Sequence, residues 1–299
     1  MNKLAHDQVG LILSLVSVHD HPWAVCKDWH HLVLSRPDLM ACMLVGISPE
    51  PIYVLVKHGP VGINRNTAVL GRLLELPRPS LDDDLSDALS VAIERGFHET
   101  VQLMLQKWPE LNTPDALFQA VDLGHEDIVR LILGCPTNPQ KANVKDGHAL
   151  VTAAGKGLTK IVRLLLEWPE NAPRADCQDG QALVEAAYYG HLDVVPLLLE
   201  WPKNAPRADC RDGDALVYAT WKGHLDVVRL LLEWPENAPR ADCQDGQALV
   251  YAVTYGHLDV VRFLLEWPEH TPRANCQDGQ ALVEAAYYGH LDMKNQILF

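Results

Sequence analysis

Two residue types that bind metals recur in this sequence at an interval of 33 residues. The first row is Cys177, Cys210, Cys243 and Cys276, and the second row is His191, His224, His257 and His290. Zinc holds such ligands at roughly 2.0–2.3 Å in one tetrahedron, which residues a whole period apart cannot form. We therefore expect no metal site, and we expect the histidines to hydrogen-bond their turn and link neighbouring loops.

The cysteines are also badly spaced for disulfides. Stacked helices lie roughly 8–10 Å apart, whereas the Cα atoms of a disulfide come within about 7 Å. Reduced thiols in an intracellular protein fit this spacing better. The sequence has no GxxxxGK[ST] loop and no HExxH motif. Its acidic residues occupy repeated positions, so we predict no catalytic residue, no cofactor and no enzyme activity.

The interval of 33 residues belongs to the chain as a whole. The seventeen residues Cys177–Asp193 return letter for letter as Cys276–Asp292. Asp-Gly pairs, single glycines and a run similar to "VVRLLLEWP" recur with the same period. A fixed period of this length is typical of a stacked array of structural repeats.

Each copy reads as two helices. Leu183, Ala186 and Gly190 have the i, i+3, i+7 spacing of one helix face. Asp179 is placed to cap the start of this helix, and Gly190 is placed to end it. Pro202 stops the second helix, and a polar loop leads to the next copy. The unit is therefore predicted to be helix, tight turn, helix and long loop.

The pattern "ALVEAAYYGHLDVVPLLLE" is similar to the ankyrin repeat, which is also 33 residues long. The usual Thr-Pro-Leu-His is replaced by "QALV", and the usual loop by "WPENAPRADC". We expect these changes to alter local hydrogen bonding and loop shape but not the fold. The resemblance implies an all-α solenoid of stacked helix-turn-helix units, preceded by a small helical segment, that binds a protein partner in its concave groove.

We assign residues 86–299 to the repeat array, with a truncated last repeat, and residues 46–85 to a degraded repeat and a linker. Residues 1–45 resemble an F-box, the segment that binds the Skp adaptor of cullin ubiquitin ligases. The resemblance implies adaptor contacts from five residues: Leu11, Ile12, Leu15, Val25 and Trp29. The alternative interpretation is a pair of helices that caps the first repeat.

Composition limits the partners. The net charge of −14 disfavours a nucleic-acid partner, which needs clustered Lys and Arg. The longest apolar run, Val9–Val16, is too short to cross a membrane. We expect a monomer in the cytoplasm, with the nucleus as the other possible location.

Positions that differ between copies indicate where a partner binds. The slots of Gln181, Glu185, Tyr188 and Tyr189 vary and share one face of the first helix, while Leu183 is repeated. Aromatic residues gather in these slots, and we predict a partner site made by Tyr188, Tyr189, Tyr218, Trp221, Tyr251, Tyr255, Tyr287 and Tyr288. The alternative is that the rings fill space between helix ends.

Together these patterns predict an adaptor that recruits a protein for ubiquitin transfer. In that role the repeats select the substrate and the F-box-like segment binds the ligase. The alternative function is a plain ankyrin scaffold without a role in ubiquitin transfer.

Overall fold

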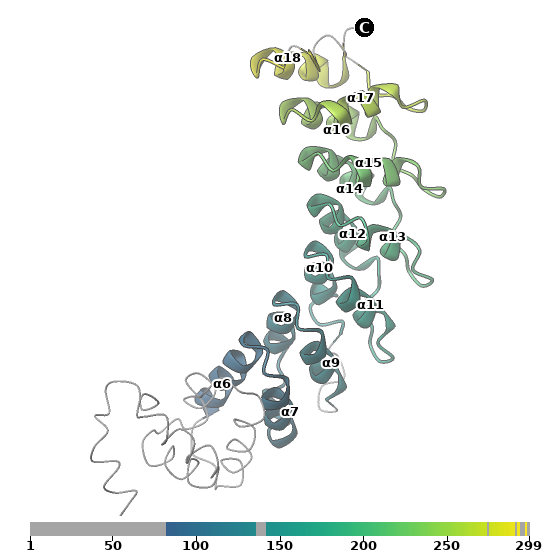
Figure 1. The fold of residues 1–299 in the computed structure, drawn as a ribbon. Helices are drawn as coiled ribbons and strands as arrows, with labels where there is room; N and C mark the ends of the chain where they lie inside the picture. Colours follow the sequence, from purple (N-terminus) through teal and green to yellow (C-terminus); the bar gives the residue numbers. More distant parts are fainter. Residues whose placement is uncertain (1–81, 136–141, 274, 291, 294–296, 298–299) are drawn as a thin grey trace, which may run out of the picture. The chain divides into compact units, whose positions relative to one another are not determined.

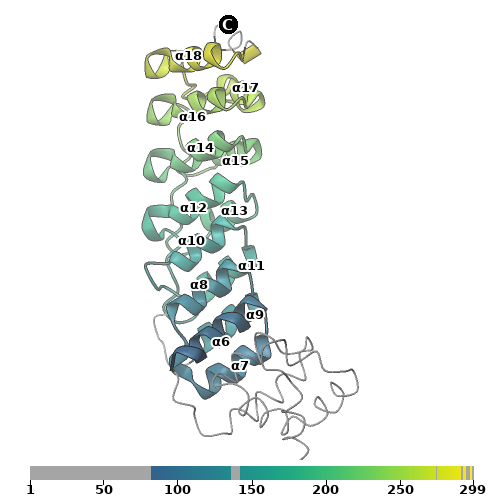
Figure 2. The same cartoon turned by 90° about the vertical axis from the view of Figure 1, so that its left-hand side faces the viewer.

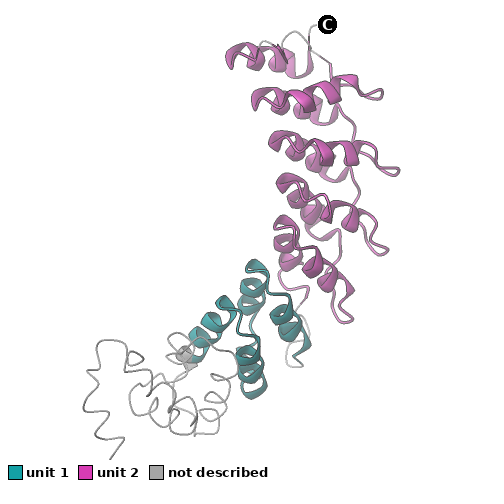
Figure 3. Cartoon of the chain, viewed as in Figure 1, with its two compact units in different colours: residues 1–138 teal, residues 139–299 magenta. Residues whose placement is uncertain are grey.

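The computed structural model describes residues 82–135, 142–273, 275–290, 292–293 and 297. Every regular element in these ranges is a helix, so the predicted all-α class is confirmed. The chain divides into two compact units, residues 1–138 and 139–299, and each is described by itself (Figure 3). The F-box-like segment lies outside the described residues.

The first unit contains two helix-turn-helix pairs. Its elements are α6 (Asp82–Glu94), α7 (His98–Lys107), η1 (Pro109–Leu111), α8 (Pro114–Asp122) and α9 (Glu126–Gly134). Helix α6 packs on α8, and α7 packs on α9. The array boundary that we placed at residue 86 falls inside α6, so the acidic stretch read as a linker is partly helical.

The second unit continues the same pattern. Its elements are α10 (His148–Gly155), α11 (Thr159–Glu167), α12 (Cys177–Tyr189), α13 (Val194–Leu199), α14 (Cys210–Lys222), α15 (Leu225–Leu232), α16 (Cys243–Thr254), α17 (Leu258–Glu266), η2 (Cys276–Gly279) and α18 (Gln280–Tyr287). Figures 1 and 2 show the first helices, α10 to α18 in even numbers, lying one above the other. The second helices, α11 to α17 in odd numbers, form a second layer beside them.

The repeated apolar positions form the core between these layers. In one repeat Leu183, Ala186 and Leu198 have no exposed surface, and the same holds for their equivalents in the next repeat. Burying a leucine side chain stabilises the fold by about 1.5–3 kcal/mol. The small alanines let neighbouring first helices approach closely. Because the core residues recur every 33 positions, each repeat gains its stability mainly from its neighbours.

A left-handed turn precedes the regular part of most first helices. Gln178, Asp179 and Gly180 have φ values of 51°, 55° and 79°, and the Gly180 N–H donates to the Asp176 carbonyl at 3.1 Å. A left-handed backbone costs about 1–2 kcal/mol for each non-glycine residue. The following repeat offsets part of this cost, because the Gln178 side chain donates to the Asp146 carbonyl of the preceding turn at 3.1 Å.

The prediction that Asp179 caps the first helix is therefore wrong. Asp179 lies within the left-handed turn, and no side chain caps the start of α12. The equivalent residue two repeats later, Asp245, accepts a hydrogen bond from the N–H of Gln277 in the next repeat at 3.0 Å. This aspartate position links repeats instead of capping its own helix. The prediction for Gly190 is confirmed, since it ends α12 with a φ of 76°.

Candidate functional site

Six of the eight predicted partner-binding residues come together on three neighbouring first helices, α12, α14 and α16. We call this set the aromatic strip, and its members are Tyr188, Tyr189, Tyr218, Trp221, Tyr251 and Tyr255. Tyr189 and Tyr255 keep 54% and 52% of their surface exposed, and the other four are half-buried. The rings contact one another but are not enclosed in the core.

Trp221 is the centre of the strip. Its ring centroid lies 5.5 Å from that of Tyr188 on α12, 5.9 Å from Tyr218 on its own helix, and 5.7 and 5.8 Å from Tyr251 and Tyr255 on α16. Tilted and edge-to-face contacts at such distances are favourable for aromatic pairs. The strip is therefore a continuous surface across three repeats.

Lys222 adds a positive charge to the strip. Its Nζ atom lies 4.7 Å from the ring centroid of Tyr188 and 5.0 Å from that of Trp221, within range of a cation–π interaction. Sequence reasoning treated Lys222 only as a variable position. The signal was its place in the slot that holds tyrosine at 189, 255 and 288. The faces of the two central rings are thus already partly occupied by a cation from the chain itself.

The tyrosine hydroxyls of the strip are available to a ligand. In the part of the chain that the structure describes, none of the five hydroxyls hydrogen-bonds to another residue. The acidic side chains nearby are already paired, because Glu185 accepts from Gln181 at 2.7 Å and Asp214 pairs with Arg211 at 2.9 Å. The strip therefore offers apolar ring surface together with unpaired hydroxyl donors.

The histidine row fixes the backbone beneath these rings. The Nε2 atoms of His224 and His257 lie 3.1 and 3.0 Å from the carbonyl oxygens of Tyr188 and Trp221, each in the preceding repeat. His191 makes the same contact with Gly155 at 2.8 Å. Because a carbonyl only accepts, each Nε2 carries the proton. The prediction that the histidines link neighbouring loops is confirmed.

The cysteine row has a packing role. The Sγ atom of Cys177 lies 4.0 Å from the Gly147 carbonyl oxygen, and a Cβ added to Gly147 would lie 2.6 Å from that sulfur. Burial raises the pKa of the Cys177 and Cys243 thiols to about 12 and that of Cys210 to about 11. All described cysteines are free thiols. Such buried, protonated thiols are poor nucleophiles and poor metal ligands.

The remaining predicted site residues stand apart from the strip. Tyr287 and Tyr288 on α18 contact each other at 5.0 Å, and Thr254 occupies the intervening slot on α16. Tyr287 is 80% exposed. The five F-box-like residues, which are Leu11, Ile12, Leu15, Val25 and Trp29, lie outside the described residues. Their roles, like the binding role of the strip, stay predictions.

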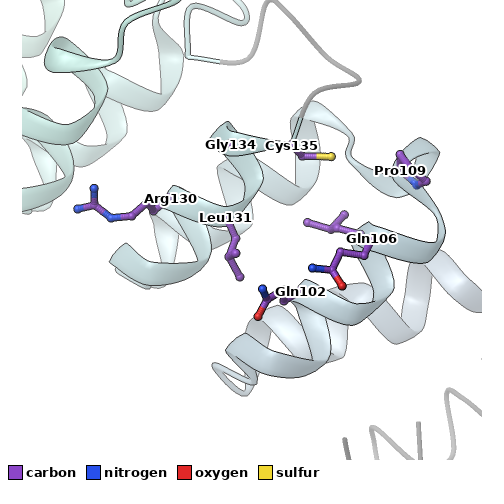
Figure 4. A pocket seen from close by; sticks show the side chains of 8 residues that line it. Gln102, Gln106, Pro109, Arg130, Leu131, Gly134 and Cys135 are labelled. Atoms are coloured by element: carbon purple, nitrogen blue, oxygen red, sulfur yellow. The ribbon is translucent and has the colours of Figure 1, made fainter. Parts of the chain in front are cut away.

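Sequence reasoning did not identify a cavity in the first unit. It has a volume of about 420 Å³ and lies between α7 and α9 (Figure 4). Figure 4 shows Gln102 and Gln106 on α7 facing Leu131 on α9. The lining is mostly apolar with two amides, and it contains no arrangement of groups that indicates a reaction. In the described residues no three His, Cys, Asp or Glu side chains are grouped to hold a metal ion.

Comparison with known protein families agrees with this architecture. A family model described as "Ankyrin repeats (3 copies)" matches residues 117–214, 150–242 and 216–298. These matches cover more than half of the chain, which therefore belongs to the ankyrin-repeat family. A search of curated proteins finds no match. The repeats form a protein-interaction module, and none of the helices that the structure describes has the length and apolar character needed to span a membrane.

Proposed function

We propose that the chain is a non-enzymatic adaptor that captures a protein partner on the aromatic strip. The observation that carries this proposal is the continuous contact of six rings across three repeats, with Trp221 at its centre. Tyrosine and tryptophan are the residues most enriched at interface hot spots, where truncation to alanine costs about 2 kcal/mol or more. The exposed ring surface and unpaired hydroxyls support a binding role over a role in filling space.

The finer proposal is that the adaptor serves a cullin-type ubiquitin ligase. Its support is the F-box-like pattern of residues 1–45, with Leu11, Ile12 and Trp29 among the matching positions. In this role the repeats hold the substrate and the N-terminal segment binds a Skp adaptor. The alternative remains a plain scaffold whose N-terminal segment caps the first repeat.

Two measurements on the Trp221→Ala variant test the role of the strip. Partner capture from native lysate should be lost while the melting temperature falls by only a few degrees. Tyr287→Ala is the matched control, because this exposed tyrosine lies outside the strip. A large drop in melting temperature with capture intact would show that the rings belong to the core.

A separate measurement tests the ligase role. A purified Skp adaptor should bind the full chain and should not bind the Leu11→Ala/Ile12→Ala variant. Absence of binding to the unmutated chain would leave the scaffold as the function.

A further inference from the structure

We infer that the aromatic strip recognises a proline-rich segment in the polyproline II conformation, with prolines at every third position. This inference rests on the proposed function, since it names the kind of partner segment that the strip would take. It follows from the repeat spacing, from the chemistry of the rings and hydroxyls, and from the position of Lys222.

The first argument is the spacing of the rings along the array. Helices α12, α14 and α16 are stacked in direct contact, and each contributes two rings to the strip (Figure 2). Packed helices lie roughly 8–10 Å apart. A polyproline II helix has three residues per turn and rises about 3.1 Å per residue, so it advances about 9.3 Å per turn. A segment laid along the strip would therefore present the same face to each successive repeat.

The second argument is the chemistry of the surface. Proline rings are flat and apolar, and they pack well on the faces and edges of Tyr and Trp. A polyproline II segment has no internal hydrogen bonds, so its carbonyl groups are free to accept from hydroxyl donors. The strip supplies both parts, with Trp221 at its centre and no intramolecular partner for the five tyrosine hydroxyls within the described chain. Aromatic-lined surfaces of this kind bind such segments because the extended helix is already ordered before binding.

The third argument concerns the competing anchor, a basic side chain. The Lys222 ammonium lies 4.7 and 5.0 Å from the ring centroids of Tyr188 and Trp221, so the cation–π position on the central rings is already taken. An arginine or lysine from a partner would meet a like charge at this position. The neutral proline ring meets no such repulsion.

The experiment is a selection of random twelve-residue peptides displayed on phage against the full, folded chain. Peptides that also bind the Trp221→Ala chain are removed by counter-selection. The expected result is enrichment of sequences with proline at positions i, i+3 and i+6. Enrichment of sequences without this period, or no enrichment at all, would overturn the inference.

Affinities of one enriched peptide, measured by fluorescence anisotropy, make the test quantitative. A peptide of the same composition with its prolines moved out of the three-residue period should bind at least 10-fold more weakly. Tyr255→Ala should weaken binding at least 5-fold, and Tyr287→Ala should leave it unchanged. Tyr255 is half exposed, so this variant remains informative if Trp221→Ala fails to fold. Equal binding of the two peptides, or of the two tyrosine variants, would contradict the inference.

Failure of this inference can be separated from failure of the proposed function. If a lysate protein is captured and then lost on Trp221→Ala, but period-three prolines are not selected, only the polyproline inference fails. If Trp221→Ala changes neither capture nor peptide selection, both fail.

Discussion

The imidazole of His224 donates a hydrogen bond from Nε2 to the carbonyl oxygen of Tyr188, 36 residues earlier in the chain, at 3.1 Å. The bond joins the turn of one repeat to the end of the first helix in the preceding repeat. It also fixes the backbone that carries one ring of the aromatic strip. Its loss should therefore affect both stability and binding.

We expect His224→Ala to lower the free energy of unfolding by about 1 kcal/mol, the usual net value of an intramolecular hydrogen bond. His224→Gln should lose less, because the glutamine amide can donate to the same carbonyl. Urea unfolding followed by circular dichroism measures both variants. Equal losses for alanine and glutamine would show that ring packing, not the hydrogen bond, is what matters here.

Stability should fall as the pH falls below about 6.5, the ordinary pKa of histidine. Burial lowers the pKa of His224 in the folded chain, and the positive charges of His191, His257 and Lys222 lower it further, against the opposing effect of the bond to Tyr188. Between the lowered pKa and about 6.5 the unfolded chain binds more protons, so acid favours unfolding in that window. The loss between pH 7.5 and pH 5.5 should be smaller in His224→Gln. His98→Gln, in the first unit, should leave the loss unchanged.

Alkylation of the cysteine row by iodoacetamide should be slow in the folded chain. The thiolate is the reactive form, and burial raises the pKa of Cys177 and Cys243 to about 12. Mass spectrometry of tryptic peptides should show these two sites modified far more slowly than half-buried Cys135 and rapidly after unfolding. Rapid modification of Cys177 in the folded chain would contradict the assigned packing.

The pair formed by Gly180 and Cys210 should show coupled energetics. A Cβ on Gly180 would lie 2.7 Å from the Cys210 sulfur, and Gly180 has a φ of 79°. We expect Gly180→Ala to cost about 2 kcal/mol or more from backbone strain and the clash together. Cys210→Ala should relieve the clash alone, so the double variant should lose less than the sum of the single losses.

Gly279→Ala is the matched control for this pair. Gly279 has a φ of 81°, but a Cβ there would meet nothing within 4 Å. The variant should show the cost of the backbone strain without the clash. If Gly180→Ala and Gly279→Ala cost the same in urea unfolding, the contact with the Cys210 sulfur has no energetic role.

Features that depend on the repeat period could be predicted from the sequence. The helix pairs, the glycine at 190 and the linking role of the histidines follow from spacing alone, because each repeat supplies the same neighbour to the next. The clustering of tyrosines in the variable slots also indicated which helix face carries the strip. In these cases the local pattern and the tertiary contacts agree.

Other features depend on side-chain geometry that the sequence does not encode locally. Asp179 has the residue type of a helix cap, but the chain enters a left-handed turn there because the next repeat compensates its cost. The contact of Lys222 with two rings depends on how a flexible side chain on α14 reaches back to α12. The split between the strip and the Tyr287–Tyr288 pair also depends on three-dimensional position, which the equal sequence spacing conceals.

The side-chain links between repeats all point toward the N-terminus. His224, Gln178 and Cys177 each contact backbone that was synthesised earlier, in the repeat before their own. During translation a repeat therefore acquires its last contacts only after the following one has left the ribosome. A nascent chain always carries one incompletely fastened unit at its growing end, and so would any product cut by a protease between two repeats.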